Sequence, residues 1–488
     1  MACTTILVGK NASYDGSTIV GRNEDSPSGL YNPKKFIAVK KEEQPKKYKS
    51  VLSHVEIDLS QDEAMNYTAN PNAEYNEGYW AAFGVNEANV SMTATETITA
   101  NSRLLGADPL VKLQKAQGKK GEKDYKPEVP GGIGEEDLVT LVLPYIHSAR
   151  EGVYRLGKLL EEYGTYEMNG IAFQDEDEIW WLETLGGHHF MARRVPDDSY
   201  VVMPNQLGID RFNFKDAFNE AKDYICSKDL KDFILEHHLG PDKDVINPRL
   251  VFGTKADSDR TYNTARAWSI LKRFNPRTSK WEGPEAEYKP TDFDLPWCLK
   301  PEFKLTVEDL KAALSDHYQF TDYDPYEHKD TPFRPIGISR TNELGIVQIR
   351  PYGQPLEWKT YGSNVFNALI PTYTHVLDTP KYFRDTTNKL SLDSFYWANR
   401  LIGALADPHF HATSNEIERY QKAVGAKMYE LINKYDQKLK DGADLVKTSE
   451  AANQEIADFV KKETDKLLDK VLYIASNKMK NGFARSDA

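Results

Sequence analysis

The strand-like runs near the start of this chain come in pairs joined by short polar turns. Residues 3–8 and 17–22 are rich in β-branched side chains and flank a polar segment that ends in Asp-Gly. Residues 79–85 and 89–95 flank a three-residue turn in the same way. Strands that follow one another through turns this short pair antiparallel. The pattern therefore predicts antiparallel sheets and argues against a doubly wound parallel sheet.

Helices are expected in blocks between and after the strands. Acidic residues open a helical region over 135–163, where a helix N-terminus favours them. Thr306 and Asp309 form a capping box that predicts the start of another helix. From residue 391 onward the chain is mostly helical, with a long amphipathic stretch from 414 to about 480. Further strands are predicted at 36–40, 170–174, 179–183, 188–194, 199–203, 336–340 and 345–350, and further helices at 214–227, 230–238 and 262–274.

The composition limits the classes of binding partner and the cellular compartment that the protein would suit. The 62 Lys and Arg residues against 74 Asp and Glu give a net charge of −12, which argues against nucleic acid or a membrane surface as the main partner. Three cysteines without a CxxC pair form no disulfide framework and fit a reducing compartment. The first apolar run is too short for a signal peptide, and no later run approaches a membrane span. We therefore expect a cytoplasmic protein.

The position of Cys3 allows two interpretations. In the first, Cys3 is a structural residue buried in an N-terminal strand, because free cysteines are commonly buried and inert. Alternatively, removal of residues 1 and 2 would place its own α-amine beside its thiol. Such an amine titrates at about 7.7 to 8.0, so it can act as a base near neutral pH without a histidine.

An arginine and an aspartate follow at the end of the second strand. The Asp-Gly turn would fold Arg22 and Asp25 back beside Cys3. A guanidinium there would lower the thiol pKa, and a carboxylate three residues on could orient the amine or the arginine. On its own, the same R-x-x-D spacing also fits an ordinary surface ion pair.

The opening CTTILVGKNASYDGSTIVGRNEDS resembles the cysteine dipeptidases of peptidase family C69 and, more distantly, the bile salt hydrolase and penicillin acylase group. The segments GVNEANVSMTATET, YVVMPNQLGIDRFNF and YNTARAWSILKRF extend the resemblance through most of the chain. It implies the α+β fold of N-terminal nucleophile hydrolases, an αββα sandwich of two antiparallel sheets between helical layers. We expect that catalytic domain over 3–385 and a helical C-terminal extension over 386–488, packed on the same domain. The charged, Gly- and Pro-rich segment 115–136 is expected to form a lid-like insertion.

The resemblance also implies roles for single residues. Cys3 would be the nucleophile and its freed amine the base, while Arg22 and Asp25 match the R-x-x-D motif of the bile salt hydrolase group. Asn205 falls where that group has an asparagine of the oxyanion hole, and Arg266 where it has a second active-site arginine. From the residues alone, Asn205 also fits a turn after a strand, and Arg266 a solvated helix arginine.

One stretch departs from the pattern of the related acylases. Their second oxyanion asparagine is missing from the segment Thr93 to Thr97, which carries Thr95 and Glu96 instead. A carboxylate in the cleft would suit the free ammonium group of a dipeptide. We therefore predict that Glu96 and Thr95 bind substrate.

These observations predict a cysteine dipeptidase that works through a thioester and needs no metal or organic cofactor. One alternative is an amidase of the same fold that acts on N-acyl amino acids or conjugated bile salts. Another is a non-enzymatic interaction protein. Removal of Met1 and Ala2 would need self-cleavage or another peptidase, and the amphipathic C-terminal helices permit a homo-oligomer.

Overall fold

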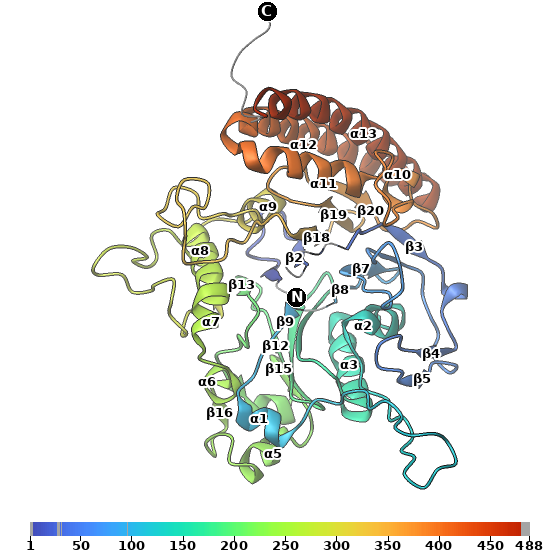
Figure 1. The fold of residues 1–488 in the computed structure, drawn as a ribbon, viewed down its shortest axis with the longest axis vertical. Helices are drawn as coiled ribbons and strands as arrows, with labels where there is room; N and C mark the ends of the chain where they lie inside the picture. The colour runs from blue at the N-terminus through green and yellow to red at the C-terminus, as the bar shows by residue number, and fades with distance from the viewer. Residues whose placement is uncertain (1–2, 27–29, 31, 95, 480–488) are drawn as a thin grey trace, which may run out of the picture.

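Two large antiparallel sheets form the centre of the computed structural model, which describes residues 3–26, 30, 32–94 and 96–479 (Figure 1). The predicted α+β class, with antiparallel sheets and long C-terminal helices, is confirmed. In the first sheet β1 is a central strand, paired with β2 on one side and β13 on the other. From edge to edge this sheet contains β17 (Cys298–Leu299), β13 (Tyr200–Met203), β1 (Thr4–Val8), β2 (Thr18–Asp25), β18 (Thr341–Ile349), β19 (Leu356–Tyr361) and β20 (Ile370–Tyr373).

The second sheet is built from the middle of the chain, and its strands also pair antiparallel. The predicted turn at 86–88 joins two of its strands, β7 and β8. From edge to edge it contains β15 (Tyr224–Cys226), β12 (His189–Arg194), β11 (Ile179–Leu185), β10 (Asn169–Gln174), β8 (Ser91–Thr93), β7 (Phe83–Asn86), β6 (Tyr67–Ala69) and β3 (Ile37–Val39), with β9 (Glu96–Thr97) on β10. Two small pairs lie apart from it, β14 (Phe212–Asn213) with β16 (Val245–Ile246) and β4 (Lys47–Lys49) with β5 (Glu56–Asp58).

Side chains of β1 alternate between two hydrophobic cores. Ile6 and Val8 belong to a core that the first sheet shares with helices. Leu7 belongs to a different core, which contains residues of both sheets. Because successive side chains of a strand point to opposite faces, Cys3 and Thr5 share the face of Leu7. The start of β1 therefore directs Cys3 toward the second sheet.

Helices pack on the two sheets separately. The strands of the first sheet contact α8, α9, α11, α12 and α13, whereas those of the second contact α3 and α4. The long C-terminal helices lie together at one end of the molecule (Figure 1). The helices are α1 (Ser102–Ala107), α2 (Glu135–Val142), α3 (Ala149–Tyr163), α4 (Phe214–Phe218), α5 (Leu230–Glu236), α6 (Pro248–Phe252), α7 (Asp257–Asp259), α8 (Ala265–Phe274), α9 (Val307–Leu314), α10 (Lys381–Arg384), α11 (Phe395–Ala406), α12 (Phe410–Lys440) and α13 (Leu445–Asn477). Short turns of other helix types are η1 (Lys41–Glu43), η2 (Leu143–Tyr145), η3 (Arg260–Thr264) and η4 (Asp407–His409).

Two predicted elements are wrong. The helix expected over 214–227 ends at Phe218, because Ala221 takes a positive φ of 47° and the chain then enters β15 on the edge of the second sheet. The strand expected at 336–340 is an irregular segment whose backbone N–H groups at 336 and 337 donate to the carbonyl of Asp316. The strand begins only at Thr341. The capping box of Thr306 and Asp309 is confirmed.

The segment predicted as a lid-like insertion has two parts. Residues 115–130 are mostly exposed and fold back on themselves through bridges between Gln114 and Val129 and between Gln117 and Lys126. Residues 131–134 are buried and lead into α2. Figure 1 shows the exposed part as a loop that leaves the body of the molecule. Its role as a lid stays a prediction.

None of the helices in the described part of the chain combines the length and the apolar run that crossing a bilayer requires.

Candidate active site

Cys3 is completely buried at the start of β1. The β1–β2 register places Arg22 opposite Thr5, so its side chain lies on the same face as Cys3. Arg22 Nη2 donates to Cys3 Sγ over 3.2 Å. Burial raises the pKa of the Cys3 thiol to about 12, while the guanidinium acts in the opposite direction. A thiol with a pKa raised in this way would need a base to act in the predicted role of nucleophile.

The backbone nitrogen of Cys3 lies against Asn205. β1 and β13 pair with Thr5 opposite Met203, and the same register carried two residues further brings Cys3 opposite Asn205. The Cys3 nitrogen donates to Asn205 Oδ1 over 3.0 Å. This nitrogen is a peptide nitrogen in the full chain and would become the α-amine if residues 1 and 2 were removed. Asn205 Nδ2 donates to the carbonyl of Thr97 over 2.9 Å, so the carbonyl end of the amide holds the Cys3 nitrogen.

Arg266 is buried on α8 and binds both sides of this contact. Its Nη1 donates to the Cys3 carbonyl and, over 2.7 Å, to Thr4 Oγ1. Its Nη2 donates to Asn205 Oδ1 over 2.8 Å and to Asn263 Oδ1 over 2.9 Å. Burial lowers its pKa to about 10, aided by the nearby charge of Arg334, so the guanidinium stays charged at neutral pH. The structure thus places Arg266 at the predicted nucleophile rather than in solvent.

Besides Cys3, Arg22 contacts the carbonyl of Ala82 and two buried carboxylates. Nη2 donates to Glu135 Oε1 over 3.3 Å, and Nη1 to Glu24 Oε2 over 3.3 Å. Burial raises the pKa of Glu135 to about 7, against the opposing effect of Arg22. The sequence marks Glu135 only as an acidic residue at a helix start, so this contact was missed. Glu24 lies inside the R-x-x-D motif, two residues after Arg22, so the alternation of a strand places both side chains on one face. This signal was missed because the predicted strand ended at residue 22.

Asp25 contacts a residue that sequence reasoning also missed. Its carboxylate accepts hydrogen bonds from Arg334 Nη2 and, over 2.6 Å, from Thr341 Oγ1. Arg334 precedes β18, the neighbour of β2 in the sheet. Asp25 therefore ties the end of the strand that carries Arg22 to the next segment of the sheet. No sequence spacing connects positions so far apart.

Glu96 lies inside the site, completely buried. Its Oε2 accepts a hydrogen bond from Thr5 Oγ1 over 2.7 Å, on the face of β1 that carries Cys3. Its Oε1 is buried without a hydrogen-bond partner among the described residues. Burial raises the Glu96 pKa to about 7, although Arg266 and Arg22 favour the charged form. Thr95, the other predicted substrate contact, lies outside the described residues.

No cluster of three or more metal-ligating side chains occurs in the part of the chain that the structure describes. The adjacent histidines His188 and His189 instead bind the two oxygens of Asp108, at 3.0 and 2.7 Å.

Comparison with known proteins identifies the family. Residues 2–423 match peptidase family C69. The chain belongs to this family. The C69 chain is 50% identical to "Dipeptidase" of Bifidobacterium longum (strain NCC 2705), with all of both chains covered. It is 51% identical to "Probable dipeptidase A" of Streptococcus pyogenes serotype M3, again over all of both chains, and 42% identical to "Dipeptidase A" of Lactobacillus helveticus over 96% of each. The predicted family and enzyme class, a cysteine-type dipeptidase, are confirmed.

The contacts of Arg266 predict the effect of a conservative replacement. Arg266→Lys keeps the charge but offers one nitrogen in place of the planar fork that joins Cys3 and Asn205. We expect kcat/KM to fall about 100-fold, the scale expected when a reacting group is misplaced by an ångström. Arg273→Lys, on the same helix in a partly exposed ion pair with Asp316, is the control and should change kcat/KM by no more than about twofold. Equal kinetics for both variants would contradict a positioning role for Arg266.

Proposed function

We propose that this dipeptidase cleaves dipeptides with Cys3 as the nucleophile and the freed α-amine of Cys3 as the base. One observation carries the proposal: the nitrogen and the sulfur of the same residue are each held by a polar side chain, partly buried Asn205 and buried Arg22. Asn205 Oδ1 accepts from the nitrogen, and Arg22 Nη2 donates to the sulfur. A structural cysteine needs neither contact. We also propose the αββα arrangement of N-terminal nucleophile hydrolases, supported by the two sheets and the helices that pack on each.

Acylation begins when the amine takes the proton of the Cys3 thiol. The sulfur then attacks the carbonyl carbon of the substrate, and the carbonyl oxygen becomes an oxyanion. When the C–N bond breaks, the protonated amine gives its proton to the leaving amino acid. A neutral thiol suits this sequence, because its proton is the one that later leaves with the product. The remaining half of the substrate is bound to Cys3 as a thioester.

Hydrolysis of the thioester uses the same base. The amine takes a proton from water, the hydroxide attacks the thioester carbonyl, and the C–S bond breaks. The proton returns to the sulfur as the second amino acid leaves. In this proposal an N–H of Asn205 Nδ2 supports the oxyanion, and one such donor is typically worth about 2.7–4 kcal/mol.

The arginines and Asp25 take different parts in this proposal. Arg22 stabilises negative charge on the sulfur, because its guanidinium is already at hydrogen-bond distance. Arg266 is a positioning residue, since it fixes the Cys3 carbonyl and the oxygen of Asn205 together. Asp25 acts indirectly: its contacts with Arg334 and Thr341 fix the end of β2, the strand that carries Arg22.

Glu96 supplies the selectivity for an unblocked substrate in this proposal. A buried carboxylate oxygen without a partner is costly, and the ammonium group of a dipeptide would satisfy it. Binding a cation would also return Glu96 to its charged form. Thr95, beside it in the sequence, is kept as a proposed substrate contact.

The remaining proposals concern the wider protein. We propose a catalytic domain over 3–385 with 386–488 packed on it, supported by a core that α11, α12 and α13 share with the first sheet. The three free cysteines support a reducing compartment such as the cytoplasm, and the net charge of −12 supports small peptides rather than nucleic acid as ligands. Half-exposed Leu472 and exposed Tyr473 on α13 support a homo-oligomer.

Replacing each cysteine in turn tests the nucleophile. Cys3→Ala should lower dipeptide hydrolysis by roughly 10⁴-fold or more, because it removes the attacking atom. Cys226→Ala and Cys298→Ala are matched controls and should keep near-normal rates. Loss of activity in either control, with Cys3→Ala still active, would overturn the assignment. In the wild type, faster hydrolysis of an N-acetylated dipeptide than of the free dipeptide would favour an N-acyl amidase instead.

The position of Glu96 predicts a charge-dependent KM. Glu96→Gln should raise KM for dipeptides at least about tenfold with little change in kcat, because the charge partner of the ammonium is lost. In the wild type, KM should rise as the pH falls below about 7, since Glu96 becomes protonated below its raised pKa. In the variant KM should be flat over that range. Exposed Glu176→Gln is the control, and an unchanged KM in Glu96→Gln would remove the assignment.

A further inference from the structure

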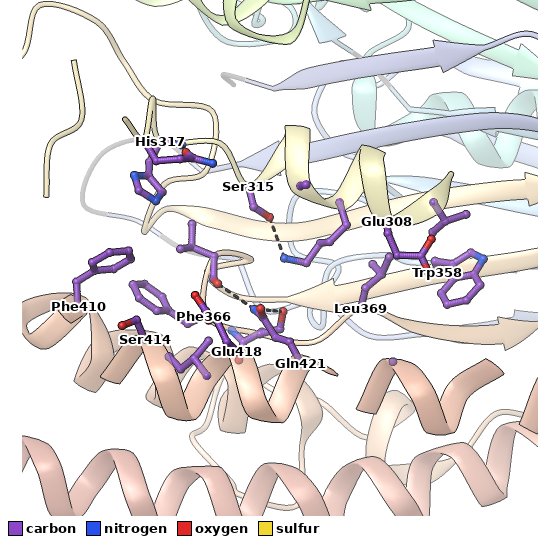
Figure 2. Close-up of a pocket in the computed structure, with 18 of the residues that line it drawn as sticks. Glu308, Ser315, His317, Trp358, Phe366, Leu369, Phe410, Ser414, Glu418 and Gln421 are labelled. Atoms are coloured by element: carbon purple, nitrogen blue, oxygen red, sulfur yellow. Dashed lines mark hydrogen bonds between the residues drawn. The ribbon is translucent and has the colours of Figure 1, made fainter. Parts of the chain in front are cut away.

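A cavity of about 490 Å³ lies away from Cys3, between α9, the segment around 365–369 and α12. Its size falls within the usual range of small-molecule sites, about 300–1,000 Å³. Figure 2 shows its apolar lining, which includes Trp358, Phe366 and Leu369. Gln421 of α12 donates hydrogen bonds to the carbonyls of residues 365 and 367 over 3.0 and 3.2 Å. These bonds fix the segment 365–367, one wall of the cavity, to α12.

Lys311 brings an ammonium group to this apolar cavity. Its Nζ donates to Ser315 Oγ over 2.8 Å and to the Asn364 carbonyl over 2.5 Å. Both acceptors are neutral, and among the described residues no carboxylate pairs with this ammonium. Desolvation lowers the Lys311 pKa to about 7, and a bound carboxylate would favour the charged ammonium form. An ammonium has three N–H donors, so one is left for a ligand.

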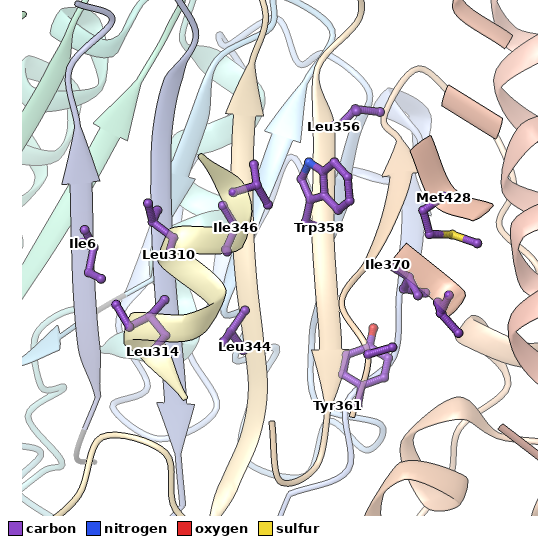
Figure 3. Packing of buried hydrophobic residues seen from close by; sticks show 14 of the residues in the cluster. Ile6, Leu310, Leu314, Leu344, Ile346, Leu356, Trp358, Tyr361, Ile370 and Met428 are labelled. Carbon is purple, nitrogen blue, oxygen red and sulfur yellow. The ribbon is translucent and has the colours of Figure 1, made fainter. Parts of the chain in front are cut away.

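The direction of Lys311 follows from the packing of α9. Leu310 and Leu314 of this helix point to the first sheet, toward Ile6, Leu344 and Ile346 (Figure 3). The helix buries that apolar face, which leaves Glu308 and Lys311 on the side that lines the cavity.

Exposed acidic side chains also line the cavity. Glu308 and Glu418 both line it and are exposed, whereas Lys311 is half-buried (Figure 2). A simple anion would meet Lys311 but be opposed by the two carboxylates. A ligand with a carboxylate, an ammonium group and an apolar side chain satisfies all three features.

We propose that this cavity is a second binding site for a small zwitterion with a large apolar side chain. Lys311 binds the carboxylate, Glu308 or Glu418 binds the ammonium group, and Trp358, Phe366 and Leu369 surround the side chain. Free apolar amino acids and apolar dipeptides share this chemistry, and they are the products and substrates of a dipeptidase. The site is separate from the catalytic mechanism proposed above.

The cavity is connected to the catalytic strand by hydrogen bonds. Asn364, whose carbonyl accepts from Lys311, donates through Nδ2 to Asn23 Oδ1 over 3.0 Å. Asn23 lies beside Arg22 on β2. Hydrogen bonds through Lys311 and Asn364 therefore connect a ligand in the cavity to Asn23, on the strand that carries Arg22.

Equilibrium binding to the full-length Cys3→Ala protein tests the proposal without turnover. The ligands are L-leucine, Leu-Leu, 4-methylpentanoate, which lacks the ammonium group, and 3-methylbutylamine, which lacks the carboxylate. Lys311→Met removes the proposed carboxylate contact. Gly425→Phe fills the cavity from α12, where a Cβ at residue 425 meets nothing within 4 Å. Exposed Lys422→Met, also on α12 but outside the lining, is the matched control.

The proposal expects L-leucine or Leu-Leu to bind at least about tenfold more weakly to Lys311→Met and to Gly425→Phe, the scale of one lost charge-assisted hydrogen bond. Lys422→Met should bind the zwitterions with the affinity of the parent protein. The parent itself should bind the two singly charged ligands at least about tenfold more weakly than the zwitterions. The zwitterion whose affinity falls in Lys311→Met shows whether the site binds free amino acids or dipeptides. Equal binding to all variants would place the ligand elsewhere and overturn the proposal. Absence of binding at about 10 mM, which excludes a Kd of about 1 mM, would overturn it as well. Dipeptide hydrolysis by Lys311→Met with Cys3 intact reports separately on the catalytic proposal.

Discussion

The position of β1 as a central strand is the constraint on which the site depends. Hydrogen bonding to β2 on one side and to β13 on the other fixes the first residues of the strand from both directions. Cys3 therefore meets Arg22 through one register and Asn205 through the other. A chain start that would fray in an exposed position is held at a defined place inside the protein.

Burial of so many charged groups around one cysteine has a thermodynamic cost. Arg22, Arg266, Glu96 and Glu135 are all nearly or completely inaccessible, and a buried charge destabilises a fold unless it is paired. The arginines meet most of that requirement with hydrogen bonds to carboxylates, amide oxygens and carbonyls, although Arg22 Nε lacks a partner among the described residues. Glu96 meets it only in part, since one oxygen lacks a partner among the described residues. Incomplete pairing of this kind is expected where a ligand completes the set.

Local patterns in the sequence were enough for much of the fold. The Asp-Gly turn between the first two strands, the capping box of Thr306 and the amphipathic C-terminal stretch all act within a few residues, and each element formed as expected. The helix predicted over 214–227 failed because an edge position on the second sheet outweighs local helix preference after Ala221. Sheet partners distant in sequence decide such cases, and a single sequence does not reveal them.

The same division applies to the site. Cys3 and Arg22 were singled out from their positions and Asn205 and Arg266 through the resemblance, and the structure brings all four together. The contacts of Glu135 and Arg334 depend on tertiary packing and were missed. The oxyanion role of Asn205 stays a prediction. The structure adds that its oxygen holds the Cys3 nitrogen, while Arg266 and the Thr97 carbonyl orient the amide from opposite sides.

The central claim is that the nitrogen held by Asn205 is a free α-amine in the working enzyme. Intact-mass measurement of purified, fully active protein tests it most directly. The account predicts a mass that begins at Cys3, without Met1 and Ala2. A fully active preparation whose mass retains Ala2 would contradict it, because the nitrogen would then be a peptide nitrogen with no basic lone pair.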